Sequence, residues 1–193
     1  MIINRILPKR AKKQVVFESS SDSKFIHKYS CAMLNLSDEL SNIIKQWAIE
    51  NIPSDCLYIN LDDGIEGYED TPHVTIKYGL HDADPDNLTR LADGFGPIDI
   101  QLSNIDVFNN NPNFDVLKIN IISDKLHKLN KIICDNMHFT DKFNVYIPHS
   151  TLAYIKKGTC LNLINSMNFN KLTDVVNEIY FTSRSGDEFY ITL

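Results

Sequence analysis

Hydrophobic residues recur along this chain with two periods, one typical of strands that are buried on one face and one typical of amphipathic helices. Alternating or β-branched segments bounded by turn residues predict six strands. These strands are expected at residues 29–36, 57–61, 98–107, 114–121, 178–182 and 188–192. The last two are joined by the turn 184–187 and should form a terminal hairpin.

Apolar residues at helical spacing predict two longer helices. One begins at Ser37-Asp38 and the other at Ser123-Asp124, and each start combines a serine N-cap with an acidic first turn. The buried faces are expected to consist of Leu40, Ile43, Ile44 and Trp47 in the first helix and of Leu126, Leu129, Ile133 and Met137 in the second. A shorter helix should open at Asp84-Pro85, and another is expected near residues 161–166.

The tetrad Pro-His-x-Thr occurs twice, at residues 72–75 and 148–151, each time followed by an aliphatic residue, a variable residue and a tyrosine. Alternate side chains of a strand share a face, so His73 should point the same way as Thr75, and His149 the same way as Thr151. One His-x-Thr pair is uninformative, but two copies in the same register indicate a function. Two histidines for proton transfer and two hydroxyl groups for phosphoryl oxygens suit cleavage of a phosphodiester.

The two tetrads also predict the architecture, because each follows a strand and a helix. Their histidines are 76 positions apart (149 − 73), which is too long for a solenoid repeat and suits two lobes of one domain. We therefore expect an α/β (α+β) fold in which two pseudo-symmetric lobes of antiparallel sheet, with flanking helices, surround a central cleft. Residues 25–193 should form this single domain, and residues 1–24 a poorly ordered basic arm and polar linker.

Composition narrows the class of protein. The chain has 193 residues and a formal net charge of −6, which argues against a stable nucleic-acid polymer as partner but is compatible with a small nucleotide. The four cysteines are scattered, without a CxxC pair, as in reduced cytoplasmic proteins. Neither a secretory signal nor a membrane span is recognisable, so a cytoplasmic protein is expected. We also expect a monomer or weak oligomer, with the basic arm as a tail, a transit peptide or an anchor.

The two tetrads resemble the signature of the 2H phosphoesterases, which carry two His-x-Thr/Ser motifs in a duplicated α/β fold. The flanking residues 67–80 and 147–158 are similar to the phage anti-CBASS phosphodiesterase branch of that superfamily. This resemblance implies a metal-independent enzyme without cofactors that opens cyclic di- and trinucleotide messengers such as 3′,3′-cyclic GMP–AMP, so evading host antiviral signalling. It would act in the host cytoplasm if phage-encoded.

In such an enzyme the ribose hydroxyl beside the scissile phosphodiester is the nucleophile. Histidine has an ordinary pKa of about 6.5, so one copy can act as base and the other as acid near neutrality. The sequence leaves open whether His73 or His149 is the base. Thr75 and Thr151 are expected to donate hydrogen bonds to the phosphoryl oxygens.

Three further residues are candidates for substrate binding. Tyr29 can stack on a base, Lys142 can contact phosphate, and Glu188 can accept from an exocyclic amine. The resemblance implies an acidic residue near the C-terminus in this role, and Asp187 and Glu178 compete with Glu188 for it. The tyrosines that follow the tetrads, Tyr78 and Tyr154, share parity with the aliphatic positions and are expected to face the core.

Other functions remain open at this point. A cellular RNA-processing enzyme of the same superfamily would act on 2′,3′-cyclic phosphate ends or 2′,5′ linkages, and the acidic balance argues mildly against it. A binding module would hold a cyclic nucleotide without cutting it, but both tetrads are intact. The acidic loop 62–70 does not match the spacing of a Ca²⁺ loop, and the chain lacks the spacing of a zinc site, so no metal is expected.

Overall fold

The computed structural model describes residues 28–141, 143 and 145–193, which form two four-stranded antiparallel sheets with three α-helices. The basic arm expected at residues 1–24 lies outside the described residues. The first sheet has the strand order β2 (His73–Leu80), β1 (Ser30–Asn35), β7 (Glu178–Thr182), β8 (Glu188–Thr192). The second has the order β5 (His149–Lys156), β4 (Phe114–Ile122), β3 (Ile98–Phe108), β6 (Thr173–Val176). The expected mixed fold with two lobes of antiparallel sheet is confirmed.

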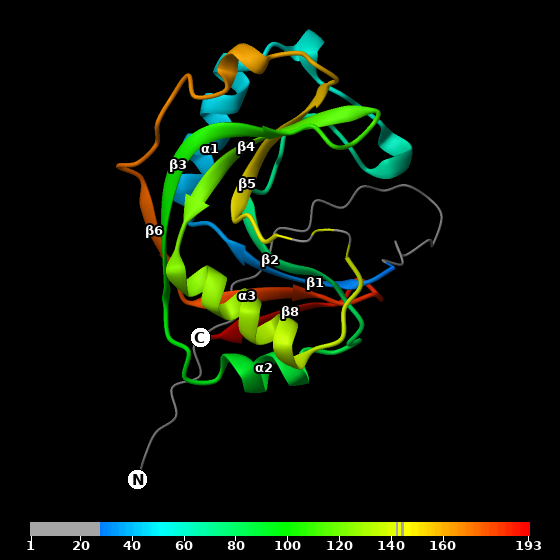
Figure 1. Cartoon of the computed structure of the whole chain (residues 1–193), viewed down its shortest axis with the longest axis vertical. Coiled ribbons are helices and arrows are strands. Elements are labelled where there is room, and N and C mark those ends of the chain that lie inside the picture. Colours follow the sequence, from blue (N-terminus) through cyan, green and yellow to red (C-terminus); the bar gives the residue numbers. More distant parts are fainter. Residues whose placement is uncertain (1–27, 142, 144) are drawn as a thin grey trace.

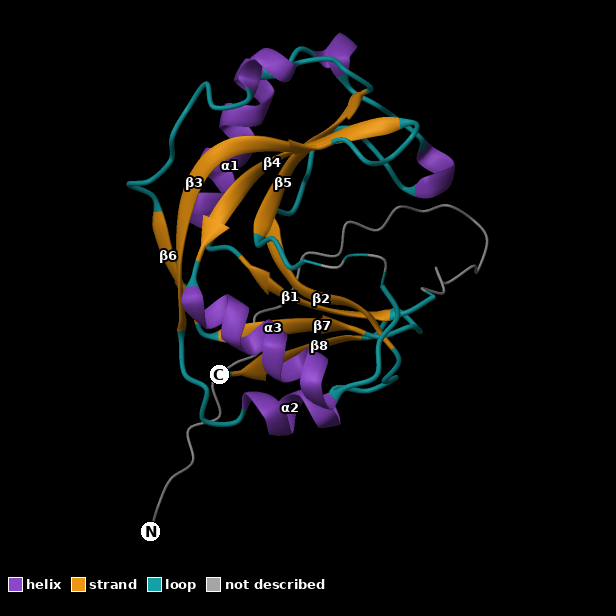
Figure 2. Ribbon diagram, viewed as in Figure 1, coloured by secondary structure: helices purple, strands orange, loops and turns teal. Residues whose placement is uncertain are grey.

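The two sheets repeat one arrangement. In each, the tetrad strand lies at one edge and pairs with the strand that precedes the long helix, β1 in the first sheet and β4 in the second. Each long helix contacts the tetrad strand of the other sheet. The helix α1 (Asp38–Asn51) follows β1 but contacts β5, and α3 (Asp124–Asn136) follows β4 but contacts β2. Figures 1 and 2 show α1 beside the upper sheet and α3 across the lower one. This exchange interlocks the two halves around one buried core.

Local signals explain where the long helices begin. The Ser37 hydroxyl accepts a hydrogen bond from the backbone N–H of Leu40 (3.3 Å), and Ser123 does the same for Leu126 (3.2 Å). The buried face of α3 is the expected one, with Met137 as its C-cap. In α1 the buried residues are Leu40, Ile44 and Ala48, whereas Ile43 is 38% exposed. The shorter helix α2 spans Asp86–Ala92 and contacts α3 and β8.

Two local expectations are corrected, and one element was not expected. Residues 57–61 do not form a strand: 3₁₀ turns at Ser54–Cys56 and Leu61–Asp63 flank them, and the chain pairs with itself at Asn60 and Ile65. The apolar side chains that suggested this strand, Ile59 and Leu61, are exposed. The helix expected at 161–166 is a single 3₁₀ turn at Leu161–Leu163, and the short edge strand β6 is an additional element.

None of the helices described in residues 28–193 is long and apolar enough to cross a membrane.

Candidate active site

The two tetrads lie at the junction of the sheets. His73 is the first residue of β2 and His149 is the first residue of β5, and both side chains are half-buried. The strands β2 and β5 contact each other. The segment before β2 also bonds to β5, through Glu69 N–H to Leu152 O (3.1 Å) and Tyr154 N–H to Gly67 O (2.7 Å). The duplicated histidines, 76 positions apart in sequence, are thereby close enough for the charge of His73 to act on His149.

Both imidazole rings are held in the same way. The Nδ1 atom of His73 lies 2.8 Å from the carbonyl oxygen of Thr71, and Nδ1 of His149 lies 2.7 Å from that of Ile147. A carbonyl oxygen can only accept, so each Nδ1 carries a proton and donates it. This fixes the tautomer of the neutral ring and leaves Nε2 of each histidine for proton transfer.

Each histidine also faces an asparagine on the neighbouring strand, a feature that the sequence reasoning missed. His73 pairs with Asn35 at the end of β1, and His149 pairs with Asn120 near the end of β4. A signal was present, because each asparagine is soon followed by the Ser-Asp start of the next helix. The repeated unit is therefore longer than the tetrad.

The two histidines differ in their electrostatic surroundings. Burial lowers the pKa of His149 below its ordinary value of 6.5, and the positive charges of Lys118 and His73 lower it further, against the opposing effect of the bond to Ile147. The Phe108 ring meets the His149 ring edge to face at 4.7 Å between centroids, and the Lys118 ammonium lies 4.5 Å from the Phe108 centroid. These surroundings favour the neutral form of His149.

Lys118 is a buried cation that belongs to this site. Its ammonium pairs with the Asp106 carboxylate at 2.8 Å and donates to the Asn120 side chain, while its own side chain is 1% exposed. The ion pair and hydrogen bonds make a buried charge tolerable. Because Lys118 pairs with Thr151 across the strands, it brings a positive charge next to the second tetrad.

His73 has a carboxyl group as its neighbour instead. The Glu69 side chain accepts a hydrogen bond from the backbone N–H of Thr71 (3.1 Å). Thr71 is also the residue whose carbonyl oxygen orients His73. Burial raises the pKa of Glu69, and the charge of His73 opposes that rise. One histidine thus faces a lysine and the other a glutamate, although their tetrads match.

A second asymmetry concerns the residues that pair with the two threonines across the strands of each sheet. In the second sheet, Thr151 is followed across the strands by Lys118 and Asp106. In the first sheet, Thr75 is followed by Met33, Tyr180 and Tyr190. The row that starts at Thr151 is therefore charged, and the row that starts at Thr75 is apolar and aromatic.

The predicted substrate-binding residues have different outcomes. Tyr29 lies six residues before Asn35, the strand partner of His73, and is therefore about 20 Å from His73 along the strand direction. Tyr29 stacks on His81 (centroids 5.6 Å apart, interplanar angle 12°), and the structure does not bring it to the tetrad histidines His73 and His149. Lys142 lies outside the described residues. Glu188 is an exposed residue of β8 that hydrogen-bonds to Tyr180, and burial together with this carboxylate raises the pKa of Tyr180.

The expectation that both tetrad tyrosines face the core is wrong for Tyr78. A register shift between Ala32 and Met33, opposite Ile76, changes the parity of β2 after the tetrad. Tyr78 is consequently 46% exposed, with its ring edge-on to Tyr29. Tyr154 is half-buried against Phe114.

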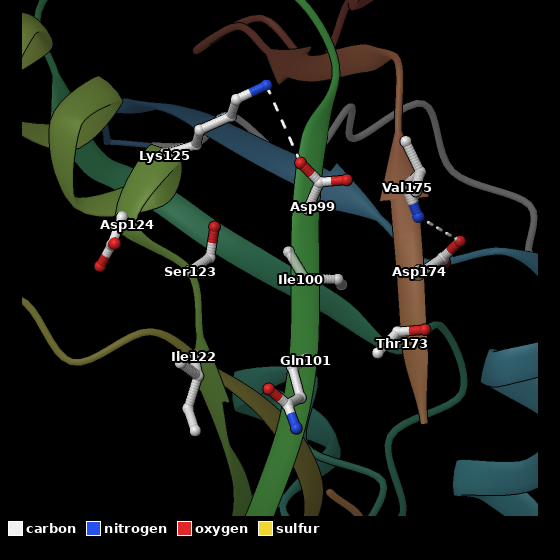
Figure 3. A pocket seen from close by; sticks show the side chains of 10 residues that line it. All are labelled: Asp99, Ile100, Gln101, Ile122, Ser123, Asp124, Lys125, Thr173, Asp174 and Val175. Carbon is white, nitrogen blue, oxygen red and sulfur yellow. Dashed lines mark hydrogen bonds and ion pairs between the residues drawn. The ribbon is translucent and has the colours of Figure 1, made fainter. Parts of the chain in front are cut away.

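Two grooves of about 510 Å³ each lie on the surface, and they share Asp174 and Val175 of β6. The first runs between β3, β6 and the start of α3, with the Lys125–Asp99 pair at one end (Figure 3). The second crosses β7 and β8. Neither groove is lined by the histidines, but the second begins at Asn35, the strand partner of His73. Among the described residues, His, Cys, Asp and Glu side chains form no group of three that could hold a metal ion.

No family model matches the chain, and no curated protein matches its sequence. Solved structures do match. E. coli LigT complexed with 3′-AMP has a TM-score of 0.55 at 15% identity, covering 86% of this chain and 94% of that one. Usb1 of Kluyveromyces marxianus with uridine monophosphate has a TM-score of 0.56 at 11% identity, covering 85% and 97%. A crystal structure of a phosphoesterase has a TM-score of 0.53 at 14% identity, covering 86% and 95%. The likeness concerns the fold, and the chain has the 2H phosphoesterase fold expected from its tetrads.

Proposed function

We propose that this protein is a metal-independent phosphodiesterase that opens cyclic di- and trinucleotide messengers, such as 3′,3′-cyclic GMP–AMP, and so evades CBASS antiviral signalling in the host. The observation that carries the proposal is the matched pair of histidines. Each donates from Nδ1 to a carbonyl two residues upstream and so keeps Nε2 for the substrate. Two rings prepared alike suit a reaction in which one proton is removed and another is supplied.

The surroundings of the rings favour different roles for the two histidines. His149, whose pKa is lowered, is the base: its Nε2 removes the proton of the ribose 2′-hydroxyl. The hydroxyl oxygen then forms a bond to phosphorus while the bond to the leaving ribose oxygen breaks. His73, with the Glu69 carboxyl group as its neighbour, gives the Nε2 proton to that leaving oxygen. Attack of water on the resulting 2′,3′-cyclic phosphate, with the roles reversed, restores both rings.

Hydroxyl groups and one cation stabilise the charge on phosphorus. Thr75 and Thr151 share the faces of His73 and His149 and donate hydrogen bonds to the non-bridging oxygens. Lys118, opposite Thr151, adds a positive charge in a region shielded from water, where charge interactions are stronger.

A small nucleotide as substrate has support from several sides. The net charge of −6 disfavours a nucleic-acid polymer, and solved structures of the same fold hold 3′-AMP and uridine monophosphate. The flanks of both tetrads resemble the anti-CBASS branch. Lys142 and Glu188 remain candidates for substrate contact, and Glu178, which lines the second groove, is better placed than Glu188 to meet a base near His73. Tyr29 can contribute only to a substrate that extends far along β1.

The test is ring opening in the presence of EDTA. Purified full-length protein and the His73→Ala, His149→Ala double variant are incubated with 3′,3′-cyclic GMP–AMP, and linear products are separated by chromatography. Opening by the wild type alone supports the proposal, whereas a strict requirement for added Mg²⁺ or Mn²⁺ refutes it. Tight binding of the intact ring without cleavage by the wild type would identify a binding module.

A second candidate is cleavage of 2′,3′-cyclic phosphate ends of RNA, and one observation favours it: LigT of the same fold is solved with 3′-AMP, which bears a phosphate on a terminal ribose. The same assay with a short RNA that ends in a 2′,3′-cyclic phosphate separates the two candidates by their relative kcat/KM.

A further inference from the structure

Four side chains lie in one row across the first sheet, and the row leads away from the first tetrad. Thr75 pairs with Met33, Met33 with Tyr180, and Tyr180 with Tyr190. Directly paired residues point to the same face of a sheet, so all four side chains lie on the face that carries His73. Neighbouring strands are about 4.8 Å apart, which places the Tyr180 backbone about 10 Å and the Tyr190 backbone about 14 Å from that of Thr75.

The two tyrosines form one aromatic surface. Their ring centroids are 5.2 Å apart with an interplanar angle of 37°. Tyr190 is 49% exposed, and Tyr180 is half-buried with its hydroxyl bonded to Glu188. Aromatic faces of this kind stack on nucleobases without needing a particular base.

The tyrosines line the second groove, which begins at Asn35 beside His73. Its volume of about 510 Å³ is in the range of small-ligand sites. The groove has the carboxylates of Asp174 and Glu178, and no lysine or arginine is among the described residues that line it. Such a lining repels a phosphate group and leaves an uncharged ring as the suitable occupant.

The corresponding row of the second sheet has the opposite chemistry. There Thr151 is followed by Lys118 and Asp106, a cation and its counter-ion. Positive charge therefore reaches the tetrads from the second sheet, and aromatic surface reaches them from the first. A nucleotide that bridges the tetrads can satisfy both only with its phosphate toward Lys118 and its base over the first sheet.

We propose that Tyr180 and Tyr190 form a stacking platform for the nucleobase of the nucleotide whose phosphate lies between His73 and His149. This inference rests on the proposed function, because the histidines define where the phosphate lies. The platform makes the base contribute to affinity, and it fixes the direction in which a substrate crosses the cleft.

The test measures binding apart from cleavage. Affinities of the full chain for 3′-AMP and for ribose 5-phosphate, which lacks a base, are measured by calorimetry in EDTA. We expect 3′-AMP to bind wild type at least about 5-fold more tightly, the lower end of what stacking on an aromatic ring contributes. Tyr190→Ser should lose most of this difference, while Tyr190→Phe, which keeps the ring, should retain it.

Two more variants make the result decisive. Tyr190→Leu keeps an apolar side chain without an aromatic face, and it replaces Tyr190→Ser if the serine variant does not fold. Tyr78→Ser removes a tyrosine of similar exposure (46%) that lies outside the row, and it should bind like the wild type. Equal affinity of wild type for the two probes would overturn the platform, and so would unchanged 3′-AMP binding by Tyr190→Ser or by the Tyr190→Leu variant that replaces it.

Failure of the platform and failure of the proposed function are distinguishable. Histidine-dependent ring opening without any effect of Tyr190 on binding refutes only the platform. Binding of 3′-AMP that depends on Tyr190, in a protein that opens no cyclic nucleotide and no cyclic phosphate end, refutes only the cleavage reaction.

Discussion

Replacing Gly79 by alanine should destabilise the protein strongly, because this glycine lies where β2 leaves its regular register. Gly79 has a φ of +88°, which is strained for an L-residue. A Cβ atom added there would lie 2.8 Å from the carbonyl carbon of Thr140 and closer still to its oxygen. The loop would have to move away, although Thr140 N–H donates to Gly79 O at 2.9 Å.

The magnitude follows from these three effects. Backbone strain, the steric overlap and the weakened hydrogen bond together should lower the free energy of unfolding by about 3–5 kcal/mol. Gly64→Ala is the matched control: Gly64 has a φ of +68°, but a methyl group added there would meet no atom within 4 Å. It should cost only about 1–2 kcal/mol, the strain alone.

Urea unfolding followed by circular dichroism measures both variants. The reasoning is refuted if Gly79→Ala and Gly64→Ala shift the unfolding midpoint equally, since the close approach of Thr140 would then contribute nothing. A selective loss for Gly79→Ala would also connect the bulge of β2 with the loop that leads to the second tetrad.

The remaining predictions concern the tetrads. Lys118→Met removes a charge that lowers the pKa of His149, so this pKa should rise. The acidic limb of the pH profile of kcat/KM should then move to higher pH. A limb that does not move contradicts His149 as the base. Thr75→Val and Thr151→Val should each lower kcat about 10- to 100-fold with little change in KM, as expected for a hydrogen bond made mainly in the transition state. Ser150→Ala should raise the melting temperature slightly and leave kcat unchanged, because the Ser150 hydroxyl is buried without a hydrogen-bond partner among the described residues; a loss of stability would reveal a partner.

The sequence predicted the repeated parts of this fold well, because strong local signals specify them. The terminal hairpin has the expected bounds at Glu178–Thr182 and Glu188–Thr192, and both long helices begin at their predicted serine caps. Alternation also placed each histidine on the face of its threonine. The duplication then indicated which strands would meet.

Features that depend on pairing between distant strands were not predictable in this way. The exposure of Tyr78 follows from a register shift between β1 and β2, which no pattern within β2 reveals. β6 is a four-residue edge strand that is defined by its pairing with β3. Residues 57–61 alternate like a strand, but within the described part of the chain they form isolated bridges, from Leu57 to Ile155 and from Asn60 to Ile65, and not a continuous ladder.

The electrostatic asymmetry of the site was hidden for a related reason. Lys118 and Asn120 alternate with apolar residues in β4, so their shared face could be read from the sequence. Their position beside Thr151 and His149 required the register of β4 with β5. Glu69 likewise lies in an acidic loop, and only its hydrogen bond to Thr71 brings it to His73.

The most direct test of the account compares two leaving groups. A nucleotide ester with a 4-nitrophenyl leaving group needs no proton from an acid, whereas a ribose leaving group does. His73→Ala should therefore lose about 10²–10⁴-fold in kcat on a dinucleoside substrate but far less on the aryl ester. His149→Ala should lose activity on both. The reverse pattern would exchange the roles of the two histidines, and equal losses by His73→Ala on both substrates would contradict acid catalysis by His73.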